Sequence, residues 1–262
     1  MYPDKLIPGL NVNLYGVMIA VGLLACFGVL FYYTKRKGLD SRYTDFIFYD
    51  AVFSIAFGFL SAALFQAFYN YLENPEQGFR FGSGITFIGG LIGGVISFLL
   101  IYFIFRKYSY GKLTDILSIA PCCILIAHAF GRLGCLFAGC CHGEYLGKDY
   151  VFGGIFMRPN GGLSGYYVPI QLYESLFLFI LFGVCSYLVL KKDFKHNLSI
   201  YLIFYGIFRF VNEFFRSDSR GQFIGSLSPS QFWSIVMVIA GVGVYFLLEY
   251  IYKKRALKGE ES

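Results

Sequence analysis

The chain has 262 residues, of which 57% are hydrophobic and 15% are charged, and its mean hydropathy is +0.60. A water-soluble domain of this size would rarely carry so few charges. The composition therefore excludes an ordinary soluble domain and predicts a protein that is solvated by a lipid bilayer. The formal net charge of +6 calls for no nucleic-acid partner, because most basic residues group beside hydrophobic stretches.

Hydrophobic stretches long enough to cross a bilayer recur along the whole chain. A helix needs roughly 20 apolar residues to cross a hydrocarbon core of about 30 Å. Seven stretches meet this requirement, and they predict an all-α, polytopic membrane protein with a single transmembrane domain over residues 1–262. We place them at Leu14–Tyr33, Phe46–Tyr69, Ile85–Phe105, Leu113–Phe130, Pro169–Leu190, Leu198–Phe215 and Gln231–Tyr252.

Basic residues predict the orientation of these stretches, because Lys and Arg collect on the cytoplasmic side of short loops. They cluster after the first, third, fifth and seventh stretches, so one alternating topology explains all four clusters. We expect the N-terminus outside and the C-terminus in the cytoplasm, and we expect the first stretch to remain uncleaved because it lacks a basic n-region. The clusters are Lys35, Arg36, Lys37 and Arg42; Arg106, Lys107 and Lys112; Lys191, Lys192 and Lys195; and Lys253, Lys254, Arg255 and Lys258.

The sixth stretch carries polar residues at helical spacing. These residues are Tyr205, Arg209, Glu213 and Arg216. Intervals of four, four and three residues place them on one face of a helix. An arginine within a span costs at least about 2.5 kcal/mol on insertion scales, so it is retained where it is paired or functional. One interpretation is an internal Arg209–Glu213 ion pair with Arg216 at the interface. The interpretation that we favour is an anion site, in which two guanidinium groups bind a phospholipid phosphate.

Other polar residues stand near the predicted outer ends of neighbouring stretches. Arg132 lies in Gly131-Arg132-Leu133-Gly134, where the glycines allow a ligand or backbone to come close. Gln171 and Glu174 fall in the first turn of the fifth stretch, where a carboxylate suits the helix dipole. Glu174 is compatible with two roles: a charge that faces lipid headgroups, and a binding residue.

Glycines recur four residues apart between residues 82 and 94 and include Gly89 and Gly90. This small-residue pattern is typical of membrane helices that pack closely. A glycine-rich helix start on the outer side can also present backbone N–H groups to a phosphate. We therefore interpret Gly89 and Gly90 both as packing residues and as candidate substrate-binding residues.

Three of the seven cysteines and one histidine fall within eight residues of one predicted outer segment. They are Cys135, Cys140, Cys141 and His142. Their spacing matches no standard zinc pattern, so it predicts no metal site and no cofactor. Two interpretations remain: a catalytic thiol whose pKa is lowered by His142 and Arg132, or small apolar packing residues.

The order of these motifs resembles that of the bacterial prolipoprotein diacylglyceryl transferases over nearly the whole chain. The motif of the sixth stretch is the most specific part of the resemblance. The matching segments are Leu14-Tyr15-Gly16, Thr86-Phe87-x-Gly89-Gly90-Leu91-Ile92-Gly93, Gly131-Arg132-x-Gly134, Gln171-Leu172-Tyr173-Glu174, Tyr205-Gly206-x-Phe208-Arg209-Phe210-x-x-Glu213-Phe214-x-Arg216 and Ser230-Gln231.

The resemblance implies a membrane enzyme of the bacterial plasma (inner) membrane. Such an enzyme transfers the diacylglyceryl group of phosphatidylglycerol to the lipobox cysteine of an exported prolipoprotein, forming a thioether and releasing glycerol phosphate. It implies that Arg132 and Arg209 bind the phosphate, that Glu213 orients Arg209 and that Arg216 assists. Tyr15 and Tyr205 would contact the headgroup.

Several positions depart from the family pattern. Ile88 stands where the family usually has a histidine that is often given the role of base. Cys135, Ala138 and Cys140 stand where Asn, Asn and Glu are expected, Val168 and Ile170 replace residues of a His-Pro-Ser-Gln run, and Ala62 replaces an arginine. These changes leave two alternatives open: a paralogue that transfers a lipid moiety to another acceptor, perhaps through its own cysteine, and a membrane protein that binds a lipid or small anion without chemistry.

Overall fold

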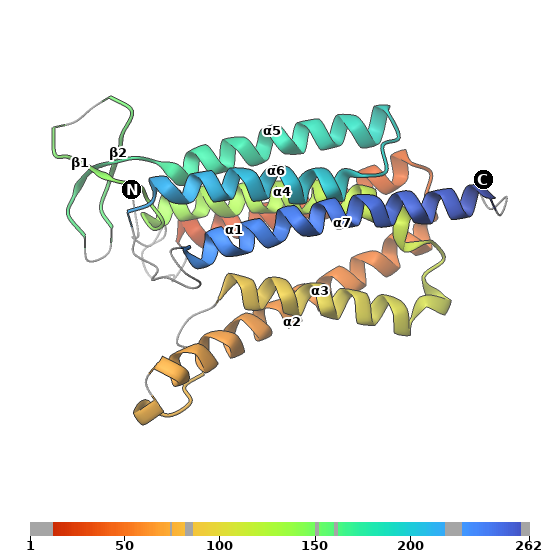
Figure 1. The fold of residues 1–262 in the computed structure, drawn as a ribbon, viewed down its shortest axis with the longest axis horizontal. Helices are drawn as coiled ribbons and strands as arrows, with labels where there is room; N and C mark the ends of the chain where they lie inside the picture. Colours follow the sequence, from red (N-terminus) through yellow and green to blue (C-terminus); the bar gives the residue numbers. More distant parts are fainter. Residues whose placement is uncertain are drawn as a thin grey trace. The chain divides into compact units, whose positions relative to one another are not determined.

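The computed structural model describes residues 13–73, 75–81, 86–149, 152–159, 162–217 and 227–257. Within these residues the chain forms seven α-helices and one small three-stranded sheet (Figure 1). It divides into two compact units, one made of residues 1–33 and 116–262 and the other of residues 34–115. The single domain over residues 1–262 stays a prediction.

The helices account for the predicted membrane spans. Six of them are long and apolar enough to cross a membrane in the described part of the chain, which confirms a polytopic helical protein. The helix that follows residue 85 is shorter, with 18 residues. The helices are α1 (Leu14–Arg36), α2 (Ser41–Glu73), α3 (Phe87–Ile104), α4 (Leu113–Ala138), α5 (Ile170–Lys191), α6 (Asn197–Asn212) and α7 (Pro229–Leu257).

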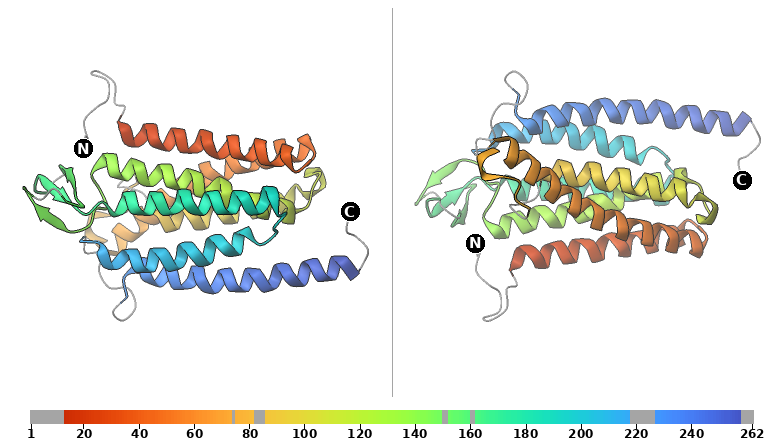
Figure 2. Two further views of the ribbon diagram at one scale, coloured as in Figure 1. Left: turned by 90° about the horizontal axis from the view of Figure 1, so that it is seen from above. Right: turned by 90° about the horizontal axis from the view of Figure 1, so that it is seen from below.

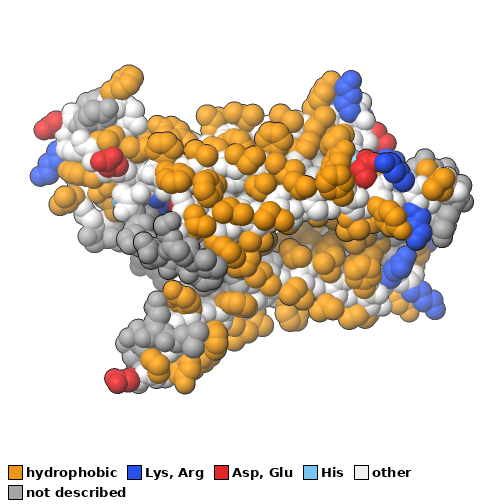
Figure 3. Space-filling view, in the orientation of Figure 1, with side chains coloured by type: hydrophobic (Ala, Val, Ile, Leu, Met, Phe, Trp, Pro, Cys, Tyr) orange, Lys and Arg blue, Asp and Glu red, His pale blue; other side chains and the backbone are white. Residues whose placement is uncertain are grey.

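The exposed surface has the composition that a bilayer requires. Large hydrophobic side chains such as Leu24, Ile239 and Phe246 are well over half exposed. Figure 3 shows hydrophobic side chains covering the sides of the helices, and Lys and Arg gathered near helix ends. Basic residues occupy the last turns of α1, α5 and α7, as the topology prediction requires. Lys258 lies outside the described residues, and the orientation of the termini stays a prediction.

In the unit of residues 34–115, α2 and α3 pack through glycines. A Cβ atom on Gly89 would lie 2.6 Å from the Cβ atom of Phe65, and one on Gly90 would lie 3.3 Å from that of Ala62. The Ser61 hydroxyl donates a hydrogen bond of 2.8 Å to the Gly89 carbonyl. These contacts confirm the predicted helix-packing role of Gly89 and Gly90, because only a missing side chain permits such an approach. Gly82 and Gly84 lie outside the described residues. A role of Gly89 and Gly90 in substrate binding stays a prediction. Short 3₁₀ helices η1 (Pro75–Gln77) and η2 (Arg106–Tyr108) belong to the same unit.

In the other unit, α1, α4, α5, α6 and α7 run alongside one another (Figure 2). The carbonyl of Ala127 in α4 would lie 3.0 Å from a Cβ atom on Gly22, so α1 and α4 approach closely there. Buried Asn197, at the start of α6, donates 3.0 Å hydrogen bonds to the carbonyls of Ser118 in α4 and Cys185 in α5. Such bonds between helices satisfy backbone and side-chain groups away from water and fix α4, α5 and α6 against one another.

The segment between α4 and α5 contains a small antiparallel sheet that the sequence analysis did not predict. Its strands are β1 (Tyr145–Gly147), β2 (Ile155–Met157) and β3 (Gly165–Tyr167), in the order β1-β3-β2. The strands have three residues each, too few to show an alternating pattern. Met157 and Tyr167 are buried beside Leu136 of α4. The sheet is therefore anchored to the end of α4.

The predicted helical face of the sixth stretch is wrong at its end. Helix α6 stops at Asn212, a 3₁₀ turn η3 (Glu213–Phe215) follows, and Arg216 has an extended backbone that bridges to Gly143. Tyr205 and Arg209 thus share the helix, whereas Arg216 reaches the same region from beyond its end. The bridge to Gly143 connects this end to the segment that follows α4.

Helix α7 begins with a capping box. The Ser228 hydroxyl accepts the backbone N–H of Gln231 at 3.2 Å, and the Gln231 side chain accepts the backbone N–H of Ser228 at 3.0 Å. Pro229 occupies the first helical position, where its missing N–H is harmless. This start places Ser228 and Ser230 near the end of α6, where both contribute to the site described next.

Candidate active site

Glu174 is the centre of a buried polar cluster formed by α4, α5 and α6. Its side chain is 1% exposed and forms an ion pair with Arg132 of α4. Tyr205 donates a 2.8 Å hydrogen bond to Oε1, and Asn212 donates a 3.3 Å hydrogen bond to Oε2. The interpretation of Glu174 as a charge facing headgroups is wrong, because three helices enclose it. A carboxylate is stable at such a position only when it is paired and hydrogen-bonded.

A second carboxylate, that of Glu213, forms ion pairs with two arginines. Arg209 Nη2 lies 2.8 Å from Glu213 Oε2, and Arg216 Nε lies 3.8 Å from the same atom. The Ser228 hydroxyl donates a 3.0 Å hydrogen bond to Oε1. The predicted Arg209–Glu213 ion pair is therefore confirmed, and Arg216 is buried with it rather than at an interface.

The two clusters belong to one electrostatic site. Arg132 pairs with Glu174, and the positive charge of Arg209 also acts on that carboxylate. Arg209 also donates from Nη2 to Ser230 Oγ at 2.9 Å. We call this group of three arginines and two glutamates the Arg–Glu site. It has a formal charge of +1, because three guanidinium groups oppose two carboxylates.

The Arg–Glu site retains donors for a ligand. Among the described residues, Arg132 Nε and Arg209 Nη1 are buried without a hydrogen-bond partner. Native proteins seldom leave buried donors unsatisfied, and such groups point to a ligand or an ion. Guanidinium groups bind phosphate and carboxylate with paired N–H groups. The arrangement can therefore bind an oxyanion.

An apolar pocket of about 260 Å³ lies between α5 and α6 beside the Arg–Glu site. Asn212, which donates to Glu174, is one of its walls, so the pocket meets the polar cluster at that residue. Such a pocket suits hydrocarbon better than a polar group. Its other lining residues are Val168, Ile170, Tyr173, Phe208, Val211 and Phe215.

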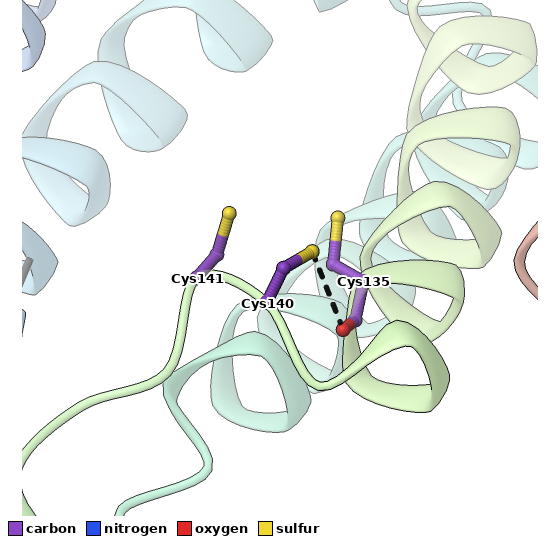
Figure 4. Close-up of side chains that lie close together, drawn as sticks. All are labelled: Cys135, Cys140 and Cys141. Atoms are coloured by element: carbon purple, nitrogen blue, oxygen red, sulfur yellow. Dashed lines mark hydrogen bonds between the residues drawn. The ribbon is translucent and has the colours of Figure 1, made fainter. Parts of the chain in front are cut away.

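Cys135, Cys140 and Cys141 gather at the end of α4, with their sulfur atoms all within 4.8 Å of one another (Figure 4). The Cys140 thiol contacts the Cys135 carbonyl at 3.6 Å, and Arg132 Nη1 lies 3.9 Å from Cys135 Sγ. We call these residues the three-thiol cluster. The contact between Arg132 and Cys135 joins this cluster to the Arg–Glu site. Left-handed backbone at Gly139 and Cys141 turns the chain back toward α4, with φ of 68° and 60°.

The thiols influence one another's protonation. Hydrogen bonds from Cys135 and Cys140 lower the pKa of Cys141, and the positive charges of Arg216 and Arg132 lower it further. The same hydrogen bonding raises the pKa of Cys140, because its proton is shared with Cys135 and Cys141. A thiolate is the form of cysteine that attacks electrophiles and binds metals.

His142 and Gln171 hold the loop that carries Cys140 and Cys141. His142 Nδ1 lies 3.0 Å from the Gly143 carbonyl, and its ring lies 4.3 Å from the ring of Tyr167 in β3. Gln171 is fully buried and donates a 2.5 Å hydrogen bond to the Cys140 carbonyl. In the segment that follows α4, His142 thus contacts a backbone carbonyl and an aromatic ring, and Gln171 contacts a backbone carbonyl.

Tyr15 of α1 reaches the end of α4 through Gly134. A Cβ atom on Gly134 would lie 3.1 Å from Tyr15 Cδ2, so the glycine makes room for the ring. A Cβ atom on Gly131, by contrast, would lie no closer than 3.8 Å to its nearest neighbouring atom. Tyr15 is 37% exposed, which leaves its ring accessible.

Comparison with known proteins identifies the family. The family model described as "Prolipoprotein diacylglyceryl transferase" matches residues 5–247. The chain belongs to this family. A phosphatidylglycerol–prolipoprotein diacylglyceryl transferase of Clostridium tetani (strain Massachusetts / E88) is 34% identical over 242 residues, which cover 90% of this chain and 93% of the relative. A protein of the same name from Dehalococcoides mccartyi (strain ATCC BAA-2266 / KCTC 15142 / 195) is 30% identical over 258 residues, covering 96% and 93%.

Membership of the prolipoprotein diacylglyceryl transferases agrees with the membrane helices, and the chain is a multi-pass membrane protein. Within the Arg–Glu site the structure brings Arg132 and Tyr205 to Glu174, and Arg209 and Arg216 to Glu213. Sequence reasoning missed Asn212 and Ser228, and it named Ser230 only as part of a family motif. The Ser-x-x-Gln spacing of residues 228–231 signals a helix start and could have drawn attention to the serines, whereas nothing in the sequence connects Asn212 with Glu174.

Proposed function

We propose that this chain transfers the diacylglyceryl group of phosphatidylglycerol to the lipobox cysteine of an exported prolipoprotein. The names of its relatives specify this donor and acceptor for those proteins. The observation that carries the proposal is the Arg–Glu site, where two buried arginines keep unsatisfied N–H groups and where Asn212, a hydrogen-bond partner of Glu174, lines an apolar pocket. A phospholipid offers both the anion and the hydrocarbon that such a site would bind.

In this reaction the acceptor sulfur attacks the glycerol carbon that bears the phosphate. A carbon–sulfur bond forms, the carbon–oxygen bond to phosphate breaks, and glycerol phosphate leaves with the electron pair. The thiol must lose its proton for this displacement, and the charge on the departing phosphate must be neutralised. Arg132 and Arg209 bind the phosphate and stabilise that charge.

The carboxylates position the arginines. Glu213 lies between Arg209 and Arg216, so it fixes both guanidinium groups. Glu174 does the same for Arg132 and is itself oriented by Tyr205 and Asn212. Tyr205 therefore acts as a positioning residue through Glu174, and Tyr15, whose ring is accessible, contacts the headgroup.

The orientation follows from the basic residues at the opposite helix ends. The last turns of α1, α5 and α7 are basic, whereas the Arg–Glu site lies where α4 and α6 end and α5 begins. With the basic ends in the cytoplasm, this site lies at the outer face of the bacterial plasma membrane. An exported prolipoprotein presents its lipobox cysteine at the same face.

The experiment is transfer from radiolabelled phosphatidylglycerol to a synthetic lipobox peptide by the purified full-length protein. We expect label on the peptide's cysteine and release of glycerol phosphate, and no label on a peptide with serine in place of that cysteine. Label on the protein itself would instead favour transfer through one of its own cysteines to another acceptor. Absence of label from both would leave lipid binding without chemistry.

A further inference from the structure

We propose that the three-thiol cluster binds one zinc ion whose remaining coordination position takes the thiol of the acceptor cysteine. This inference rests on the proposed function, and it reverses the expectation drawn from cysteine spacing alone. Cys135 comes from the last turn of α4, and the left-handed turn at Gly139 and Cys141 brings the other two sulfur atoms beside it (Figure 4). The structure thus brings together the sulfur atoms of three cysteines that are five residues and one residue apart in the sequence.

The spacing of the sulfur atoms suits a small thiophilic cation. Tetrahedral zinc with Zn–S bonds of about 2.3 Å requires sulfur atoms about 3.8 Å apart. The three sulfur atoms lie within 4.8 Å of one another. Side-chain rotations that move sulfur atoms by roughly 1 Å would bring all three to the spacing that zinc requires. Cys140 is exposed, which gives an ion a path to the cluster.

Charge favours the same assignment. Three thiolates around one Zn²⁺ carry a net charge of −1, and the guanidinium group of Arg132, whose Nη1 lies 3.9 Å from Cys135 Sγ, opposes that charge. Without a cation, three thiolates at this separation would repel one another strongly. The contact of Arg132 with Cys135 stabilises a ligated sulfur from outside, as outer contacts do at metal sites.

The ligand set is incomplete in the way that catalytic zinc sites are. In the described part of the chain, no histidine or carboxylate joins the three thiols within ligand distance. Structural zinc sites have four protein ligands, whereas catalytic sites have three and leave one position for water or substrate. The open position therefore belongs to a substrate atom that prefers zinc, and the acceptor of the proposed reaction is a thiol.

Zinc would supply the thiolate that the displacement requires. The acceptor S–H bond breaks, the proton passes to water and the sulfur binds zinc, because a coordinating thiol is deprotonated outright. The sulfur electron pair then forms the bond to the glycerol carbon while the Zn–S bond and the carbon–oxygen bond to phosphate break. Water fills the vacated position, and no oxidant or reductant is needed.

The two carboxylates of the Arg–Glu site are engaged. Glu174 accepts from Tyr205 and Asn212 and pairs with Arg132. Glu213 pairs with Arg209 and accepts from Ser228. Carboxylates that neutralise buried arginines are poor proton acceptors, since protonation would leave the guanidinium charges uncompensated.

The test is metal content and cobalt spectroscopy on full-length protein purified in detergent without chelators. We expect about one zinc ion per chain, and after exchange with Co²⁺ the visible and sulfur-to-cobalt absorption of a tetrahedral thiolate site. Addition of a lipobox peptide should change this spectrum as a further thiolate binds. The same peptide with serine in place of cysteine should leave it unchanged.

Cys140→Ser should lower the metal affinity at least 10-fold, whereas Cys185→Ala, at a buried cysteine of α5, is the matched control and should retain the metal. Gln171→Leu provides a second test in case Cys140→Ser fails to fold. It leaves all three thiols in place but removes the hydrogen bond to the Cys140 carbonyl, so it should weaken metal binding about 10-fold. Four outcomes would overturn the proposal. The purified protein could lack metal, it could retain metal after all three cysteines are replaced, the cluster could contain a disulfide, or the cobalt spectrum could fail to respond to the peptide.

These outcomes separate the zinc proposal from the proposed function. Peptide labelling by metal-free wild-type protein would overturn the zinc site and leave the transferase intact. A zinc site that binds the peptide thiol, in protein that transfers no lipid from phosphatidylglycerol, would support the site and refute the donor. Both assays use the same protein and the same peptides.

Discussion

Arg132 in the last two turns of α4 and Glu174 in the second turn of α5 form an ion pair that Tyr205 and Asn212 of α6 complete with hydrogen bonds. The pair serves two purposes. It neutralises two charges that the membrane interior would otherwise exclude, and it points a guanidinium group with a spare donor toward the ligand region. Stability and activity of this site can therefore be separated by substitution.

Glu174→Gln should destabilise the protein by about 3–5 kcal/mol, because it leaves the Arg132 charge buried and uncompensated. Thermal unfolding in detergent measures the change. The double variant Arg132→Met with Glu174→Leu should recover most of the lost stability, since it removes both charges, yet it should transfer no lipid. Transfer at the wild-type rate by the double variant would contradict the assignment of Arg132 to the phosphate.

Arg209→Ala should lower lipid transfer by at least about 100-fold while the protein still inserts in the membrane, because one charge-stabilising group is lost from the site. Arg209→Lys should remain strongly impaired, since an ammonium cannot contact Glu213 and Ser230 as a planar fork does. Peptide labelling is the measurement. Arg42→Ala, at an exposed arginine paired with Asp40, is the matched control and should transfer normally.

Tyr205→Phe should lower stability by about 1.5–3 kcal/mol, because the 2.8 Å hydrogen bond to a buried carboxylate is lost. Tyr201→Phe is a suitable comparison, since its ring stacks on that of Tyr205 one helical turn away. We expect a smaller effect there. Equal losses of unfolding temperature in the two variants would show that the Tyr205 hydroxyl has no special role.

Gly89→Ala should destabilise the packing of α2 on α3 by about 1–3 kcal/mol, because its Cβ atom would overlap with Phe65. Gly28→Ala in α1 is the control, since a Cβ atom there meets nothing within 4 Å. Unfolding in detergent compares the two. If Gly89→Ala also lowers transfer more than its lost stability explains, the predicted role of this glycine in substrate binding gains support.

The membrane helices were predictable from the sequence because hydrophobic length and basic flanks are properties of single segments. The Arg209–Glu213 pair was predictable for the same reason, since four residues on one helix fix the distance between two side chains. The way in which α6 ends was not predictable from the sequence. Its last turn tightens at Glu213, and Arg216 reaches the same carboxylate only because its backbone is extended and bridged to Gly143.

The role of Glu174 depends on tertiary contacts that no local pattern encodes. Its partners are Arg132, which precedes it by 42 residues, and Tyr205 and Asn212, which follow it by 31 and 38. The three-thiol cluster was visible as a motif, but its convergence depends on the left-handed turn at Gly139 and Cys141. A non-glycine residue seldom adopts that conformation, so spacing rules based on ordinary backbone gave no zinc ligand pattern.

The Arg132–Glu174 pair also bears on how the protein enters the membrane during synthesis. Each of these charges alone would oppose insertion of its helix, at a cost that reaches about 2.5–3.5 kcal/mol at a helix centre. Helices α4 and α5 are consecutive, and the sheet between them is anchored on Leu136 at the end of α4. The two helices therefore partition most favourably as a hairpin whose charges have already met, rather than one after the other. If synthesis stopped between the two helices, Arg132 would face lipid without its carboxylate partner. We therefore expect α4 and α5 of this enzyme to insert into the membrane together as a hairpin.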